Sequence, residues 1–454
     1  MRIAPLLGVV AASGGCAAED LPPLGQVVLF VDTDAPLPPP PGEAEGPDDL
    51  PALFDTARVD VFSADGQCAP CSHEFSVDRD RIGANASLGI LPRPGAAGDI
   101  ARVRLFRAAL LTQNEPRWDS TIDVAFALPA VAEGDIEEVT VFLPTDLAGH
   151  PLSDLASPLQ PEKGRPKKPR VGTWPGAQRV SCAEAAAPDE VCVPGGAYWM
   201  GNPSLTTAQL TEPADQQRLV VVQPFFVDRT EVTVGRFRAS GLASAQDPRR
   251  ASELGGKALT DWCTYTETPT GLEEMPINCI SWLKAREFCL SAGKDLVSEA
   301  RYEFVAGALR SWDFVWGRDD ASCADAVFGR GGHGILSAIA YAPCKPSEGI
   351  GGPLFVGSGA RDAFTLPTGT IVDLAGNLSE HALDVWNAQG EPCWTAGVHH
   401  DPLCTQQGAV PAAHGVRGGN WVGTRRHLLA ARRRVMEESD WEPYVGFRCA
   451  RPGG

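Results

Sequence analysis

The cysteines constrain the fold of this chain more than any other feature of its sequence. There are thirteen of them, an odd number, so one thiol stands apart if the others pair. Setting Cys16 aside, five local couples are Cys68 with Cys71, Cys182 with Cys192, Cys263 with Cys279, Cys323 with Cys344, and Cys393 with Cys404, which leaves Cys289 with Cys449. Spacing alone does not prove connectivity. Six bridges need an oxidising compartment, so the count favours an exported protein.

The N-terminus supports export. Residues 1–16 read MRIAPLLGVVAASGGC, with Arg2 before a short apolar stretch and small residues before Cys16. About ten apolar residues are too few to span a bilayer, which favours an export signal over a membrane helix. The stretch resembles a bacterial lipoprotein signal, which implies lipid anchoring at Cys16 in the outer membrane or periplasm. An ordinary cleaved signal is the alternative.

The chain of 454 residues is long enough for two or three domains. Residues 22–150 contain short stretches that alternate apolar and polar side chains between turn residues, which predicts a small antiparallel β-sandwich. Residues 151–180 are rich in Pro and Lys, which predicts a semi-rigid, extended linker. A second domain then spans residues 181–454. The formal net charge of -18 argues against nucleic-acid binding.

The second domain carries seven ordered motifs. In sequence order they are PGGAYWMG, EVT at Glu231–Thr233, ISWLKAREFC, SEARYE, GNLSE at Gly376–Glu380, RGGNW at Arg417–Trp421, and GFRCA at Gly446–Ala450. Thr233 and Ser281 precede helical patterns and are candidate N-caps, and a further short helix is expected from Ser298. The remainder is typical of loops and short strands.

These motifs resemble those of the formylglycine-generating enzyme family, also called sulfatase-modifying factors. The resemblance implies an irregular α+β fold related to C-type lectins, preceded here by the all-β sandwich. It also implies a disulfide between Cys289 and Cys449.

The resemblance does not extend to the copper-binding cysteines on which the family's oxidase activity depends. Oxidases of this family hold copper with two cysteines, which would fall at Gly423 and near Leu428, and no cysteine lies between Cys404 and Cys449. Copper(I) needs soft thiolate ligands. We therefore expect a catalytically silent domain that binds a peptide, protein or glycan in the cell envelope, or one that only braces a partner. A cysteine-to-formylglycine oxidase is the weaker alternative.

A different metal is the rival hypothesis. A non-haem iron enzyme would need histidines and carboxylates to converge, and His381 together with the run His399, His400 and Asp401 offers the right residue types. The same residues also fit a solvated loop. A structural calcium is the metal that the resemblance favours. It implies carboxylate ligands at Asp373 and Glu380 and backbone oxygens at Gly376 and Leu378, a donor set that suits Ca²⁺.

An arginine cluster follows the Gly-Gly-Asn-Trp turn. It consists of Arg425, Arg426, Arg432, Arg433 and Arg434. One interpretation is surface pairing with the nearby Glu437, Glu438 and Asp440, which stabilises a fold little. The other is an anion-recognising patch.

Overall fold

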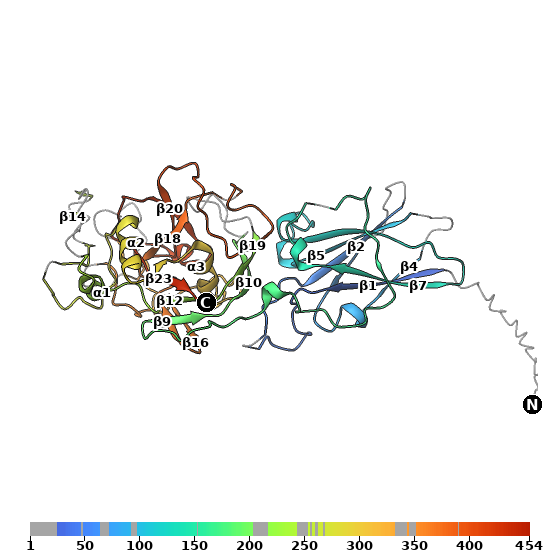
Figure 1. Cartoon of the computed structure of the whole chain (residues 1–454), viewed down its shortest axis with the longest axis horizontal. Coiled ribbons are helices and arrows are strands. Elements are labelled where there is room, and N and C mark those ends of the chain that lie inside the picture. Colours follow the sequence, from blue (N-terminus) through green and yellow to red (C-terminus); the bar gives the residue numbers. More distant parts are fainter. Residues whose placement is uncertain are drawn as a thin grey trace, which may run out of the picture.

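A computed structural model describes residues 25–454, apart from 47–48, 64–71, 92–97, 152, 203–216, 243–252, 255–256, 259–261, 267, 332–342, 345–350 and 389. Cys16, Cys68 and Cys71 lie outside the described residues. Two bodies lie end to end, a β-sandwich and a larger α+β domain that carries the C-terminus (Figure 1). None of the described helices is long and apolar enough to cross a bilayer.

The N-terminal body consists of two four-stranded sheets. One has the order β4 (Leu88–Ile90), β1 (Gln26–Thr33), β7 (Ile136–Leu143), β8 (Glu162–Lys163), and the other β3 (Ser72–Ser76), β2 (Thr56–Phe62), β5 (Ile100–Phe106), β6 (Ile122–Ala127). Alternating apolar side chains fill the space between the sheets, as their period-two pattern predicts. One pairing differs from the antiparallel expectation, because β1 and β7 run parallel over eight residue pairs.

The segment 151–180 packs against the sandwich instead of forming an extended spacer. Strand β8 pairs with β7, and Trp174 is 2% exposed within the apolar core of the sandwich. The Nε1 of Trp174 donates a hydrogen bond to Asp146 at 2.9 Å. The packing of this one tryptophan therefore fixes the segment to the sandwich, although its Pro- and Lys-rich composition predicted an extended linker.

The C-terminal domain has three short sheets and two hairpins. The first sheet has the order β15 (Asp295–Leu296), β23 (Cys449–Pro452), β12 (Phe225–Asp228), β9 (Glu190–Val193). The second has the order β10 (Gly196–Met200), β11 (Arg218–Val222), β19 (Val398–His400). The third has the order β21 (Arg433–Glu437), β20 (Ala413–Arg417), β18 (Ser379–Val385), β22 (Val445–Gly446). The hairpins are β13 (Glu253–Leu254) with β14 (Lys257–Ala258), and β16 (Ala363–Leu366) with β17 (Gly369–Val372). This mixture of short strands and loops confirms the predicted α+β class.

In the described part of the domain three α-helices pack on these sheets, and the first two begin directly after the caps predicted for them. They are α1 (Val234–Ala239), α2 (Trp282–Ser291) and α3 (Glu299–Ala306). The side chains of Thr233, Ser281 and Ser298 accept hydrogen bonds from backbone N–H groups three residues later.

Five disulfides lie in the C-terminal domain. They join Cys182–Cys192, Cys263–Cys279, Cys289–Cys449, Cys323–Cys344 and Cys393–Cys404. All ten cysteines after residue 181 are thus paired, as the counting and the resemblance together predict. The Cys289–Cys449 bridge closes 160 residues and ties α2 to the last strand.

The two bodies share one apolar core. Trp199 of β10 and Leu219 of β11 belong to the same buried cluster as Leu53 and Phe54 of the sandwich. The Nε1 of Trp199 donates to the Leu53 carbonyl at 2.9 Å, and its ring meets Phe54 edge-on at 5.7 Å. The β10–β11–β19 sheet lies on the side of its domain that faces the sandwich (Figure 1). The domains are therefore joined by packing as well as by the chain.

Candidate functional site

The Arg417–Trp421 turn is buried, and close packing and hydrogen bonds fix its backbone. Arg417 is fully buried, and Trp421 is 1% exposed. Gly418 has a φ of +75°, and a Cβ there would lie 2.4 Å from the Tyr302 hydroxyl. The Asn420 Oδ1 accepts hydrogen bonds from the backbone N–H groups of Val422 and Gly423 at 3.1 and 2.9 Å. The turn needs glycine and asparagine for its own geometry, so its sequence reflects architecture.

At the two positions where oxidases of this family carry cysteines, this chain has Gly423 and Leu428, and both are packed against neighbouring residues. A Cβ at Gly423 would lie 2.9 Å from the Cβ of His427. Leu428, the last residue of the short 3-10 helix η9 (Arg425–Leu428), is 1% exposed and lies in an apolar cluster with Phe314 and Phe328. His427 accepts a hydrogen bond at Nδ1 from the Thr424 N–H at 2.9 Å. Burial lowers the pKa of His427 to about 4, so this imidazole is neutral at pH 7.

The predicted calcium residues lie in a buried cluster of carboxylates. Its members are Glu231, Asp362, Asp373 and Glu380, which come from four separate stretches of the chain and are each at most 1% exposed. Burial and then the charge of Asp362 raise the pKa of Asp373 to about 7. Burial also raises the pKa of Glu380 and, together with the charge of Asp373, that of Glu231.

The cation at this cluster is Arg448. Its Nε lies 2.8 Å from Oε2 of Glu380 and its Nη2 lies 2.7 Å from Oε1. Nη2 also donates to the backbone carbonyls of Val372 and Asp373, each at 2.9 Å. Asp362 instead accepts the backbone N–H groups of Leu374, Ala375 and Gly376. A guanidinium thus compensates the charge of Glu380, and backbone amides stabilise the carboxylate of Asp362.

This arrangement does not fit a calcium ion held by Glu380. Both oxygens of that carboxylate accept from Arg448, and a cation at the same point would face the guanidinium charge. Asp373 offers a single buried oxygen, Oδ1, that has no hydrogen-bond partner. Among the described residues no three His, Cys, Asp or Glu side chains form a group that could hold a metal. Calcium binding stays a prediction of the resemblance.

Replacing Asp373 by asparagine tests this charge balance. Because its folded pKa of about 7 lies above the ordinary 3.8, the folded state holds the proton between these pH values and its stability falls as pH rises through them. Asp373→Asn is therefore expected to raise the melting temperature at pH 8 by about 1–2 °C for each kcal/mol relieved, and to change it less at pH 5.

Thermal unfolding with and without calcium distinguishes the two roles of Asp373. If calcium raises the melting temperature of the wild type but not that of the variant, Asp373 is a ligand and the interpretation above is wrong.

Of the residues proposed for iron, His381, His399 and Asp401 are engaged elsewhere, and His400 is exposed. The Nε2 of buried His381 lies 2.9 Å from the Ile280 carbonyl, and the Nε2 of His399 lies 2.9 Å from the Thr395 carbonyl. Asp401 accepts two hydrogen bonds from Arg301, the shorter at 2.6 Å. The three side chains therefore serve different parts of the framework, and His399 and His400 belong to β19 instead of a solvated loop.

The expected surface pairing of the arginine cluster is wrong for Arg433. This side chain is 2% exposed, and its Nε lies 2.6 Å from Oε2 of Glu299 in α3. Arg417 lies 3.6 Å from the same carboxylate and also pairs with Glu303. The β-strand that begins at Arg433 turns its first side chain into the core, where only a distant glutamate can neutralise it. Arg425 and Arg426 are exposed.

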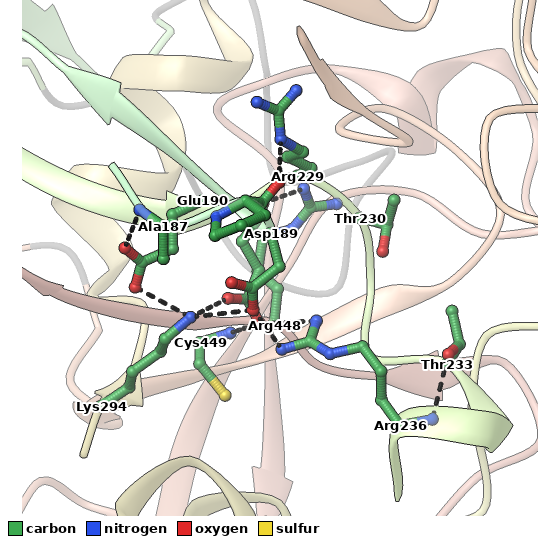
Figure 2. Close-up of polar contacts among 12 residues, drawn as sticks. Ala187, Asp189, Glu190, Arg229, Thr230, Thr233, Arg236, Lys294, Arg448 and Cys449 are labelled. Atoms are coloured by element: carbon green, nitrogen blue, oxygen red, sulfur yellow. Dashed lines mark hydrogen bonds and ion pairs between the residues drawn. The ribbon is translucent and has the colours of Figure 1, made fainter. Parts of the chain in front are cut away.

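A second charged network supports the end of the chain. Lys294 lies 2.7 Å from Asp228, 2.9 Å from Glu190 and 3.3 Å from Asp189. Figure 2 shows Lys294, Glu190 and Asp189 gathered beside Arg448 and Cys449. Asp228 also accepts from Arg236 at 3.1 Å and from the Cys449 N–H at 3.2 Å. The network joins β9, β12 and β23 to the residue that precedes β15, so it helps to hold β23 in place.

Comparison with known proteins agrees with this geometry. The sulfatase-modifying factor enzyme 1-like domain family matches residues 177–452. The chain belongs to this family. A formylglycine-generating enzyme of Thermomonospora curvata is 25% identical over 294 residues, covering 57% of this chain and 92% of that protein. An inactive Cα-formylglycine-generating enzyme 2 of Bos taurus is also 25% identical, over 310 residues that cover 58% and 88%.

Among solved structures, PvdO from Pseudomonas aeruginosa has a TM-score of 0.42 and 21% identity, and the match covers 61% of this chain and all of PvdO. The family match over residues 177–452 covers the α+β body. The sandwich lies before the matched region. Glu231 and Arg448 fall within recognised motifs, EVT and GFRCA. Arg448 pairs with Glu380 across 68 positions and Glu231 accepts from the Leu378 N–H across 147, and neither contact has a signal in local spacing.

Proposed function

We propose that this member of the sulfatase-modifying-factor family does not generate formylglycine and instead serves as a binding or scaffolding module. The observation that carries this proposal is the replacement of both copper-binding positions by Gly423, packed against His427, and by the core residue Leu428. All ten cysteines of the domain are in disulfides, so none supplies a thiolate for copper. The partner would be a peptide, protein or glycan of the cell envelope.

A copper-dependent oxidation assay tests the loss of activity. The purified protein, loaded with copper, is incubated in air with a cysteine-containing sulfatase peptide, and the peptide mass is followed. We expect no conversion of cysteine to formylglycine, whereas the Thermomonospora curvata enzyme converts the peptide under the same conditions. Turnover that depends on added copper would sink the proposal.

Export and anchoring are part of the same proposal. Five disulfides support an oxidising, extracytoplasmic location, and the sequence around Cys16 supports lipidation there. In a bacterial host, Cys16→Ala is expected to move the protein from the membrane fraction to the soluble fraction. Intact-mass measurement checks the lipid directly, and a wild-type protein without added acyl mass contradicts the anchor.

A further inference from the structure

The boundary between the sandwich and the sulfatase-modifying-factor domain encloses a cavity of about 160 Å³. Arg107 and Leu110 of the sandwich form one side. Trp199, Trp312 and Asp313 of the other domain form the opposite side. This volume resembles that of an engineered protein cavity large enough to hold one benzene molecule. A site at a fixed domain boundary is a common place for a small-molecule pocket.

Within the part of the chain that the structure describes, Arg107 has no carboxylate in hydrogen-bonding contact. It follows β5, donates through Nη2 to the Gln217 side-chain oxygen, and lies with its guanidinium carbon 5.1 Å from the centre of the Trp199 ring. Its Nε is shielded from solvent and has no hydrogen-bond partner. Burial lowers the pKa of Arg107 to about 9, because nearby Asp55 and Asp119 only partly offset the lost hydration. An unsatisfied guanidinium donor of this kind is stabilised by an anion.

The other charges of the cavity limit the anion to a single negative charge. Arg318 adds a second cation on the rim, and its side chain is exposed. Asp313 opposes it and is held by the Asn202 amide at 2.8 Å. Glu303 is committed to Arg417 and to the Gly201 N–H. The carboxylates of Asp313, Asp55 and Asp119 would repel a second negative charge on a ligand held by Arg107, which favours a monoanion over a doubly charged phosphate.

The aromatic walls favour an organic ligand. Trp312 lines the cavity and is half-buried, so part of its ring is accessible, whereas Trp199 is 2% exposed and carries the Arg107 guanidinium over its ring. A ligand with a flat apolar body and one acidic group would lie against Trp312 and supply the missing acceptor. We propose that this cavity binds a small organic monocarboxylate, with the guanidinium of Arg107 holding the carboxylate. The site is independent of the missing copper cysteines.

Isothermal titration with sodium benzoate, at constant pH and ionic strength, tests the proposal. Benzoate is small enough for the cavity and carries one carboxylate, and benzamide is its uncharged isostere. We expect benzoate to bind saturably, with one molecule per chain. Benzamide is expected to bind with an affinity lower by about tenfold or more. Inorganic phosphate is the third probe. The proposal fails if benzoate gives no saturable heat up to about 10 mM, or if benzamide or phosphate binds as tightly.

Two variants locate the binding. Arg107→Gln is expected to weaken benzoate binding by about tenfold or more. Arg81→Gln, which removes the same charge from an exposed position of the sandwich, is expected to bind like the wild type. Equal affinity in Arg107→Gln places benzoate elsewhere and overturns the assignment. If Arg107→Gln does not fold, the contrast between benzoate and benzamide on the wild type decides.

Discussion

Arg448→Met is expected to lose about 3–5 kcal/mol of unfolding free energy, because it leaves the buried carboxylate of Glu380 without its counter-charge. The side chain of Arg448 is 1% exposed and donates to Glu380 and to the carbonyls of Val372 and Asp373. Glu231 and Asp373 add negative charge close by. Methionine keeps most of the volume, so the loss reports charge and hydrogen bonding more than a cavity.

Urea unfolding at pH 7.5 measures this loss, with Arg361→Met as the matched control. Arg361 pairs with Asp319 at the surface, where the side chains are 39% and 64% exposed, so its removal is expected to leave the unfolding midpoint nearly unchanged. Lowering the pH to about 5.5 should restore part of the stability of Arg448→Met, since the buried carboxyl groups then take up protons. An Arg448→Met protein as stable as the wild type contradicts the account of the cluster.

Local patterns in the sequence predicted the elements of the fold well. Alternation placed β2, β5, β6 and β7, and the side chains of Ser281 and Ser298 cap the helices that follow them. These features depend on a few consecutive residues, so a single sequence contains them. The five bridges described followed from counting and from the family motifs.

The charged core could not be predicted in the same way. Arg433 meets Glu299 across 134 residues, and Arg448 meets Glu380 across 68. Spacing along the sequence suggests that an arginine pairs with the nearest carboxylates. An arginine whose strand directs its side chain into the core pairs with a carboxylate from elsewhere in the chain instead. Period-two alternation also says nothing about strand direction, so it did not reveal that β1 and β7 are parallel. The Arg107 cavity depends on how two domains meet, which no local motif records.

Trp199→Ala is the second variant with a large expected effect. Deleting a buried tryptophan costs about 3–5 kcal/mol through lost burial and the cavity that remains. Trp199 is 2% exposed and reaches from β10 to Leu53 and Phe54 of the sandwich. The same apolar cluster contains Leu219 and Val221 of the sulfatase-modifying-factor domain. Removing its largest shared side chain should weaken the boundary more than either separate core.

Differential scanning calorimetry distinguishes coupled from independent domains. The wild type is expected to unfold in a single transition, because its two bodies share one core. In Trp199→Ala the transition should move to lower temperature and separate into two. Trp118→Ala is the control, since Trp118 lies on the sandwich and is 52% exposed. Two transitions in the wild type would mean that the shared core does not couple the domains. The Arg107 cavity would then lie at a boundary that opens before either domain unfolds.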